Sequence, residues 1–485
     1  MAVQEEASPA GASPADGSTI SDSGGLWSPQ RRALTVGLVL TITFIASEAL
    51  AVVTIMPVVA RDLHGVSLYG WVFTAFMLGS LVGIVAAGRQ ADKFGPARPF
   101  LGGVLLFGAG LTIAGLAPSM LVLVAGRALQ GIGAGAVPAV AYVAIGRSLP
   151  EHLRARMMAV LSSAWVVPGL IGPAVAAAVA SLVGWRWVFL GLLPLVAVTG
   201  SLAMPALFRL GPRDRDGDDP ASGGAGAEHR LADGVGAAAG AGLLLAGLTM
   251  VVGSRVLIGA ALLIGGLVII GRSLRRLLPR GTFTAQPGLP AVILCRGLLT
   301  FAFFGADAYV TLTIATVRHH TPALASVAVT GATLAWTAGA WLQSRLNGRW
   351  APRRLVRCGV LIVAIGLAAM ALVLLPATPV AVGLAAWTVA GFGIGLAYAP
   401  ITLLMLGEAP PGREGWAAAS LSLADVLGAA LGIGAGGAAI ATVTGRGGPL
   451  AAGVAVAYAI AGIGAIGLAA ASRRLPAARG GEKAT

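Results

Sequence analysis

The chain has 485 residues, of which 57% are apolar and only 11% are charged, and its formal net charge is +14. Soluble globular proteins carry about 25% charged residues, so this composition excludes a soluble enzyme, a disordered chain and a secreted disulfide scaffold. Runs that stay apolar for about 20 residues predict membrane-spanning helices, and they argue against a β-barrel, whose strands alternate between apolar and polar residues.

The chain is expected to divide into two tails, two large units and a middle segment. Residues 1–30 are polar and contain four acids, so they predict a disordered cytoplasmic tail and not a signal peptide. Residues 31–208 contain six apolar spans, at about 33–58, 68–88, 99–117, 119–145, 156–183 and 187–208. A cytoplasmic linker, 209–232, follows them, and residues 233–280 hold two weaker spans, at about 233–253 and 255–271. Residues 281–472 contain six more, at about 288–316, 323–346, 354–375, 379–406, 415–442 and 449–472, before a second tail, 473–485.

The basic residues predict how the chain is oriented. With the amino terminus in the cytoplasm, 26 of the 33 basic residues lie in cytoplasmic loops and tails, five on the opposite face, and two, Arg127 and Arg296, inside spans. This asymmetry follows the positive-inside rule, places both termini in the cytoplasm, and explains the net charge without nucleic acid. We therefore expect a multi-pass protein of the cell (plasma) membrane, the inner membrane in a bacterium.

The two six-span units resemble each other. Glu48 in the first span corresponds to Asp307 in the ninth, 259 residues later, and the patterns that begin at Leu161 and Gly131 recur 260 residues later. Both units enter the membrane from the same side, so the repeat is parallel. Such repeats form transporters whose site lies between the two halves. The middle pair of spans is expected to pack at the periphery, outside the pathway.

Three acids, Glu48, Asp307 and Asp425, lie deep in apolar spans. A carboxylate there costs at least about 2.5–3.5 kcal/mol, so it is expected to face a partner or a water-filled cavity. Burial favours the neutral form of a carboxyl group, so all three are candidates for proton coupling, and a structural role is the alternative. Arg127 is expected to modulate the proton affinity of Glu48 or to form a static ion pair, whereas Arg296 is expected to snorkel to the cytoplasmic surface.

Aromatic side chains near these acids are candidates for substrate contact. Aromatic rings beside a carboxylate suit lipophilic or cationic molecules, although each ring alone is more often a packing residue. The predicted substrate-binding residues are Glu48, Trp165, Phe304, Asp307, Tyr309, Trp336 and Tyr398.

The first cytoplasmic loop, residues 88–98, reads Gly-Arg-Gln-Ala-Asp-Lys-Phe-Gly-Pro-Ala-Arg. It resembles the signature loop between the second and third spans of the major facilitator superfamily. Gly88 and Gly95 are expected to permit close helix approach and a tight turn. The resemblance implies that Asp92, with Arg98 and the start of the thirteenth span, latches the cytoplasmic side shut.

Two further motifs refine the resemblance. Glu48, nine residues before Pro57, resembles the acidic first-span motif of the fourteen-span drug:proton antiporters of this superfamily. Gly169, Gly172 and Pro173 resemble the fifth-span antiporter motif and are predicted to act in gating, because they let the span bend or pack closely. A plain packing role is the alternative.

The resemblance implies an all-α integral membrane protein with the major facilitator fold: two six-helix bundles with pseudo-two-fold symmetry plus two extra helices between them, fourteen transmembrane helices in all. It implies a proton-coupled efflux transporter of lipophilic small molecules such as drugs, cationic ones among them, that works by alternating access. A proton symporter or uniporter for a metabolite, a lipid exporter and a non-transporting receptor stay open as alternatives.

The remaining expectations concern partners and cofactors. No Gly-x-x-x-x-Gly-Lys phosphate loop is present in the sequence, so protons and not ATP are the expected energy source. We expect no enzymatic activity, no metal and no cofactor. The expected partners are the lipid bilayer and a lipophilic small-molecule substrate, with no nucleic acid, and the protein is expected to be a monomer.

Overall fold

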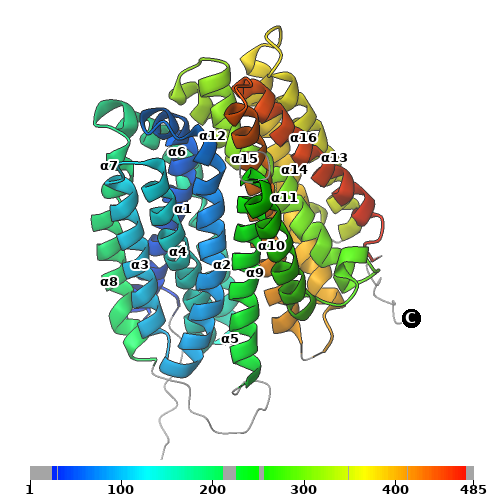
Figure 1. The fold of residues 1–485 in the computed structure, drawn as a ribbon. Helices are drawn as coiled ribbons and strands as arrows, with labels where there is room; N and C mark the ends of the chain where they lie inside the picture. Colours follow the sequence, from blue (N-terminus) through cyan, green and yellow to red (C-terminus); the bar gives the residue numbers. More distant parts are fainter. Residues whose placement is uncertain are drawn as a thin grey trace, which may run out of the picture.

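The computed structural model describes residues 25–29, 31–210, 225–250, 256–347, 349–411 and 413–476, and their regular structure is helical (Figure 1). The first bundle contains α1 (Arg32–Asp62), η1 (Val66–Leu68), α2 (Tyr69–Phe94), α3 (Ala97–Gly115), α4 (Met120–Ser148), α5 (Glu151–Ser163), α6 (Val166–Leu182), α7 (Arg186–Leu190) and α8 (Leu193–Phe208). The middle pair is α9 (Ala225–Met250) and α10 (Val256–Leu277). Most of the two predicted tails and of the linker lies outside the described residues.

The second bundle follows the short η2 (Thr282–Thr284). It contains α11 (Leu289–Leu312), a π-helical turn η3 (Thr313–Val317), α12 (Pro322–Leu346), α13 (Pro352–Leu372), α14 (Val380–Glu408), α15 (Glu414–Gly445) and α16 (Leu450–Ser472). Thirteen helical segments of the described residues are long and apolar enough to cross a membrane. The fourteenth expected span, the fifth along the chain, is divided into α5 and α6.

The break in the fifth span has a local cause. Pro168 lacks a backbone N–H, and its ring clashes with the carbonyl group four residues earlier, which belongs to Ala164. The helix is interrupted at Ala164 and Trp165, and α6 begins at Val166. The predicted apolar span at 156–183 therefore consists of two helical segments in the structure.

Small residues let the helices within each bundle approach closely, and they do so at repeated positions. A Cβ atom on Gly131 of α4 would lie 2.1 Å from the carbonyl oxygen of Phe76 in α2. In the second bundle, a Cβ atom on Gly391 of α14 would lie 2.2 Å from the carbonyl oxygen of Ala332 in α12. Only glycine permits such contacts, so the sequence repeat corresponds to the same helix contact in both bundles.

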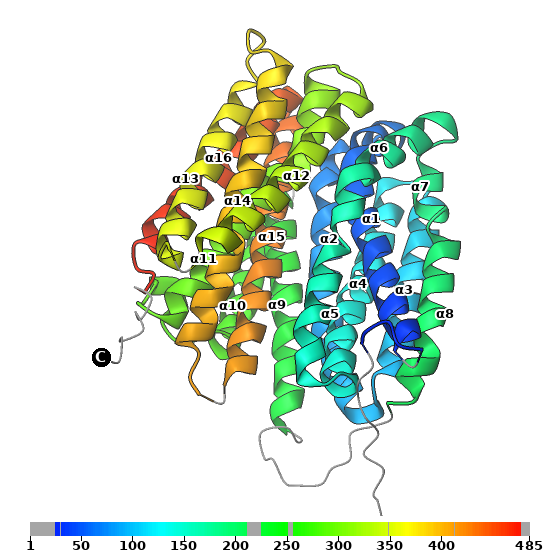
Figure 2. The same cartoon turned by 180° about the vertical axis from the view of Figure 1, so that it is seen from behind.

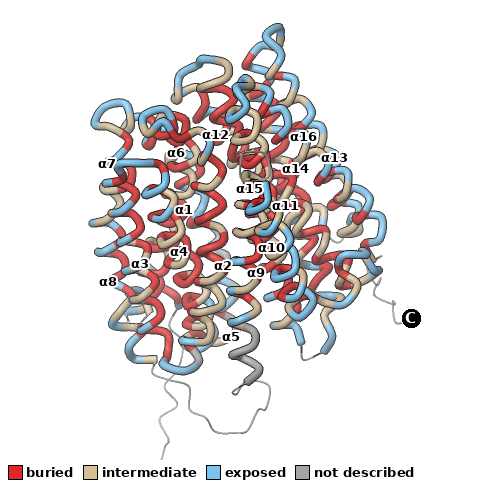
Figure 3. The backbone as a smooth tube through the Cα atoms, viewed as in Figure 1, coloured by how far each residue is buried: buried red, intermediate tan, exposed pale blue. Residues whose placement is uncertain are grey.

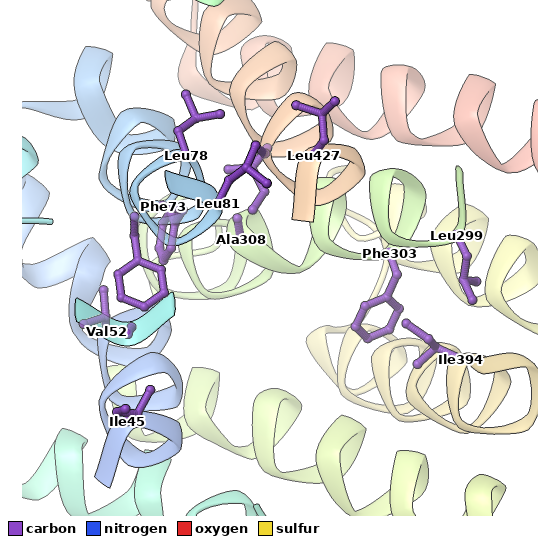
Figure 4. Close-up of a cluster of buried hydrophobic side chains, with 14 of the residues drawn as sticks. Ile45, Val52, Phe73, Leu78, Leu81, Leu299, Phe303, Ala308, Ile394 and Leu427 are labelled. Atoms are coloured by element: carbon purple, nitrogen blue, oxygen red, sulfur yellow. The ribbon is translucent and has the colours of Figure 1, made fainter. Parts of the chain in front are cut away.

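Apolar side chains fill the interior of each bundle. Figure 3 shows buried residues along the contacts between helices and exposed ones at the ends and outer faces. In Figure 4, Phe303 of α11 points toward Ile394 of α14 within the second bundle, and both side chains are at most 3% exposed. The outward side chains of α10 are large and aliphatic, such as Leu257 at 87% exposure, as expected for a surface that faces lipid.

The two bundles meet near one face and diverge toward the other (Figures 1 and 2). We call the face at which α1 begins and α16 ends the terminal face. The contacts near the opposite face include Thr311 of α11, which donates a hydrogen bond to the carbonyl of Val53 in α1 at 2.7 Å. Gly70 of α2 lies against Gly437 of α15 in the same region.

The middle pair of helices does not lie wholly at the periphery. α9 packs between α2 and α15, in the half of the molecule nearer the terminal face (Figure 2). Val85 of α2 contacts α9 at Gly234, and Leu245 of α9 fills the space beside Gly434 of α15. The expectation of a purely peripheral pair was wrong for α9, because its many small residues let it fit closely between the bundles.

Candidate functional site

Glu48 of α1 forms an ion pair with Arg127 of α4 in the interior of the first bundle. The two side chains are 1% and 2% exposed. Arg127 also donates hydrogen bonds to the side chain of Gln130, at 2.8 Å, and to the carbonyl of Val72, at 3.3 Å. Its guanidinium group lies 4.2 Å from the ring centre of Phe76. These contacts fix the position of the Arg127 guanidinium group, which balances the charge of Glu48.

Asp307 of α11 occupies the equivalent place in the second bundle, and its partner comes from the equivalent helix. The indole Nε1–H of Trp387 in α14 donates a hydrogen bond to the Asp307 carboxylate at 2.7 Å. Trp387 lies 260 residues after Arg127, so the repeat that relates Glu48 to Asp307 also relates their partners. One bundle thus uses a charged donor and the other uses a neutral one.

A third polar cluster in the second bundle contains Asp425 of α15. Tyr398 of α14 donates a hydrogen bond to the Asp425 carboxylate at 2.7 Å, and Arg296 of α11 lies 3.8 Å from its other oxygen. Arg296 donates to Thr402 at 2.5 Å and stacks on the Tyr398 ring at 3.5 Å. Arg296 is 2% exposed, so the expectation that it snorkels to the surface was wrong. The side-chain contacts with Asp425, Tyr398 and Thr402 hold Arg296 inside the bundle, so its guanidinium group does not extend to the membrane surface.

An aromatic cluster connects Asp307 and Asp425. Phe303 stacks on Trp387, with ring centres 5.1 Å apart, and its edge contacts Trp336 and Phe304. Trp336 in turn lies 5.5 Å from the ring of Tyr398. Phe304, Trp336 and Tyr398 are partly exposed, whereas Phe303 and Trp387 are buried. Three of the predicted aromatic residues therefore lie in one surface that runs between two carboxylates.

The other two predicted aromatic residues lie elsewhere. Trp165 is 47% exposed at the break between α5 and α6, outside the cluster. Tyr309 is fully buried near the opposite face, where its hydroxyl donates to the carbonyl of Ile433 and its ring lies 5.9 Å from that of Tyr69. Tyr309 therefore packs where the two bundles are in contact. Which of the predicted residues contact a substrate stays a prediction.

The sequence reasoning missed Phe303, Trp387 and Arg296 as members of these clusters. A signal was available for Trp387, since it is the repeat counterpart of Arg127. Phe303 lies four residues before Asp307, on the same face of the helix. No local signal distinguishes Arg296 from a snorkelling arginine, because its partners Asp425 and Tyr398 come from distant helices.

The loop motif is partly in its predicted place. Gly95 ends α2 with a φ angle of 79°, a conformation that favours glycine, so the predicted tight turn is present. A Cβ atom on Gly88 would meet no described atom within 4 Å, so the predicted close helix approach does not occur there. The Arg98 guanidinium lies 5.6 Å from the ring centre of Phe94. The Asp92 side chain lies outside the described residues, so its latch stays a prediction.

The fifth-span motif has one residue in a contact between the bundles. A Cβ atom on Gly169 of α6 would lie 2.3 Å from the Cγ2 atom of Thr333 in α12. A Cβ atom on Gly172 would meet no described atom within 4 Å, and Pro173 is buried inside α6. The motif therefore provides a close contact at Gly169, and its predicted role in gating stays a prediction.

The comparisons with known proteins agree with this architecture. The sequence pattern of the Major Facilitator Superfamily matches residues 36–433. A protein of Mycobacterium tuberculosis named "Probable multidrug-efflux transporter" is 30% identical over 411 residues, which cover 82% of this chain and 86% of that protein. The crystal structure of an auto-inhibited POT family peptide transporter has a TM-score of 0.64 at 16% identity, and covers 90% of this chain and 97% of its own. The crystal structure of a D-xylose-proton symporter has a TM-score of 0.58 at 16% identity, and covers 94% of this chain and 99% of its own.

The fold and the buried polar clusters define a multi-pass membrane transporter built from two pseudo-symmetric six-helix bundles. The chain belongs to the Major Facilitator Superfamily.

Proposed function

We propose that the protein is a proton-coupled exporter of lipophilic small molecules, including cationic ones, that works by alternating access. The observation that carries this proposal is the pair of equivalent carboxyl groups, Glu48 and Asp307, one inside each bundle and each held by one donor from the fourth span of its own bundle. Carboxyl groups in such places can exchange protons as the surroundings change. The name of the mycobacterial relative supports export of drugs.

We further propose that the terminal face is cytoplasmic, as the distribution of basic residues indicates. The bundles diverge toward that face, so the structure then corresponds to the inward-facing state. Substrate enters from the cytoplasm or the inner leaflet. Protons arriving from outside remove negative charge, release the substrate outward and favour return to the inward-facing state. The protein acts in the plasma membrane as a monomer, and the proton gradient supplies the free energy.

The test is substrate-induced proton release from the purified protein in proteoliposomes. Glu48→Gln keeps the size of the side chain but removes its proton exchange, so we expect it to abolish coupling. The matched control is Asp62→Asn, at the end of the same helix, where the acid is 50% exposed and pairs with Arg186. Wild-type coupling in Glu48→Gln would remove Glu48 from the mechanism. Accumulation in right-side-out vesicles and none in everted ones would show import instead of export.

A further inference from the structure

The three acids inside the bundles differ in how their charge is balanced. Glu48 has the Arg127 guanidinium as its ion-pair partner, and Asp425 has Arg296 at 3.8 Å. Asp307 has only the neutral indole N–H of Trp387 as a hydrogen-bond donor. Among the described residues, no arginine or lysine lies within ion-pair distance of Asp307.

This difference matters because the surroundings are apolar. A carboxylate without a counter-charge is strongly disfavoured inside a membrane protein, and one hydrogen bond from a neutral donor compensates only part of that cost. A positive charge from outside the protein, either a proton or the charged group of a ligand, therefore stabilises Asp307. Glu48 already has a counter-charge in Arg127, so in this conformation its charge is balanced without a ligand.

The acids also differ in how easily a ligand can reach them. Glu48 and Arg127 are 1% and 2% exposed, so a ligand cannot reach their charged atoms without rearrangement of the first bundle. Asp307 is partly exposed, and so are Phe304, one turn before it on the same helix, and Trp336 of α12. The faces of such rings attract organic cations.

We infer that Asp307, together with the faces of Phe304 and Trp336, binds the positively charged group of a planar lipophilic cation, whereas Glu48 and Arg127 form a compensated pair that does not contact the ligand. The inference rests on the proposed function and deepens it. The second bundle holds the ligand's charge, and the first bundle contributes to coupling through its buried pair.

The test is equilibrium binding of two matched dyes to the purified full-length protein. Rhodamine 123 is a planar cation, and rhodamine 110 is the same molecule with a free carboxylate that cancels its charge. Asp307→Asn keeps the acceptor for Trp387 and removes the charge, so we expect it to weaken rhodamine 123 binding by about tenfold or more and to leave rhodamine 110 unchanged. Glu48→Gln is expected to weaken rhodamine 123 binding less than Asp307→Asn does. Asp62→Asn, an exposed acid, is the control.

The outcomes separate the inference from the proposed function. If Asp307→Asn binds rhodamine 123 like the wild type, or if Glu48→Gln loses more affinity than Asp307→Asn, the inference is wrong while coupled export can still stand. If the wild-type protein binds neither dye, the proposed substrate class is wrong and the inference falls with it.

A second measurement needs no substitution and is therefore independent of folding defects. A hydrophobic carbodiimide labels carboxyl groups inside membrane proteins, and mass spectrometry locates the modified residues. We expect saturating rhodamine 123, but not rhodamine 110, to reduce labelling of Asp307. Labelling of Asp307 that is unaffected by rhodamine 123 would overturn the inference.

Discussion

The buried pair of Glu48 and Arg127 and the exposed pair of Asp62 and Arg186 show how burial changes the value of one interaction. Both pairs join an arginine to an acid of α1. Water surrounds the second pair, in which both side chains are at least 44% exposed, so its strength is largely screened. Glu48 and Arg127 are buried, so water cannot solvate one of them when the other is removed. Removing one member of this pair therefore leaves an uncompensated charge.

We therefore predict that Arg127→Met lowers the free energy of unfolding by about 3–5 kcal/mol, and that Arg186→Met lowers it by at most about 1 kcal/mol. The measurement is unfolding by SDS titration in mixed micelles. The double variant Glu48→Gln/Arg127→Met should recover most of the loss, because neither charge is then left alone. Equal losses at Arg127 and Arg186 would contradict this account of the buried pair.

At the scale of single elements, α6 shows that two glycines of one motif have different roles in this conformation. Gly169 packs directly on Thr333 of α12, whereas Gly172 has open space beside it. Glycine in the middle of a helix is less stable than alanine by about 0.5–1 kcal/mol, so it is favoured only where a Cβ atom has no room.

We predict that alanine has different effects on stability at Gly169 and Gly172. Gly169→Ala should destabilise the protein by about 1–3 kcal/mol, because Thr333 is β-branched and has few other rotamers to adopt. Gly172→Ala should leave stability unchanged or raise it by up to about 1 kcal/mol. The same SDS titration measures both variants. Thr333→Ser, which removes the Cγ2 atom, should rescue Gly169→Ala, and a failure to rescue would show that the close contact is not the cause.

The position of α9 has a consequence for the transport cycle. α2 and α15 touch near the opposite face, and α9 separates them toward the terminal face. In a transporter whose halves rock about a central site, closure of the terminal face brings α2 and α15 together where α9 now lies. On the proposed alternating-access mechanism, we therefore predict that α9 moves or deforms during each cycle.

Cross-linking tests this movement. With Cys358 replaced by Ser, cysteines at Leu245 and Gly434 joined by a short bifunctional reagent should fix α9 to α15 and stop transport, and cleavage of the link should restore it. The matched control joins Gly240 to Ile270, which are in contact within the α9–α10 pair, and should leave transport intact. Full transport with α9 fixed to α15 would show that the two helices move together.

At the scale of the whole molecule, hydrogen bonds across the two bundles contribute to the balance between conformations. Thr311 donates to the Val53 carbonyl and lies 3.4 Å from the Tyr69 hydroxyl, so one side chain of α11 contacts both α1 and α2. A hydrogen bond of this kind contributes about 1 kcal/mol, enough to shift a two-state equilibrium about fivefold.

Thr311→Val should therefore favour separation of the bundles near the opposite face and, with it, approach at the terminal face. Spin labels at Arg154 of α5 and Ser344 of α12 report the terminal-face separation by pulsed electron resonance, and the population of short distances should rise. Thr112→Val is the control, because Thr112 donates only to Gly108 of its own helix. An unchanged distance distribution in Thr311→Val would mean that this contact does not influence the balance.

The sequence by itself determined the spans, the repeat and the three acids that lie within the spans, because hydrophobicity and the cost of a membrane charge are properties of a short stretch of chain. The 260-residue offset of the repeat also relates Arg127 to Trp387. Only the tertiary structure decided the pairings: Arg127 with Glu48, Trp387 with Asp307, and Arg296 with Asp425. Each pairing joins helices that are far apart along the chain, so neither spacing nor periodicity could reveal which donor reaches which acid. The same reason applies to α9, for which the sequence predicted a peripheral position, because the helices that it contacts, α2 and α15, lie far from it along the chain.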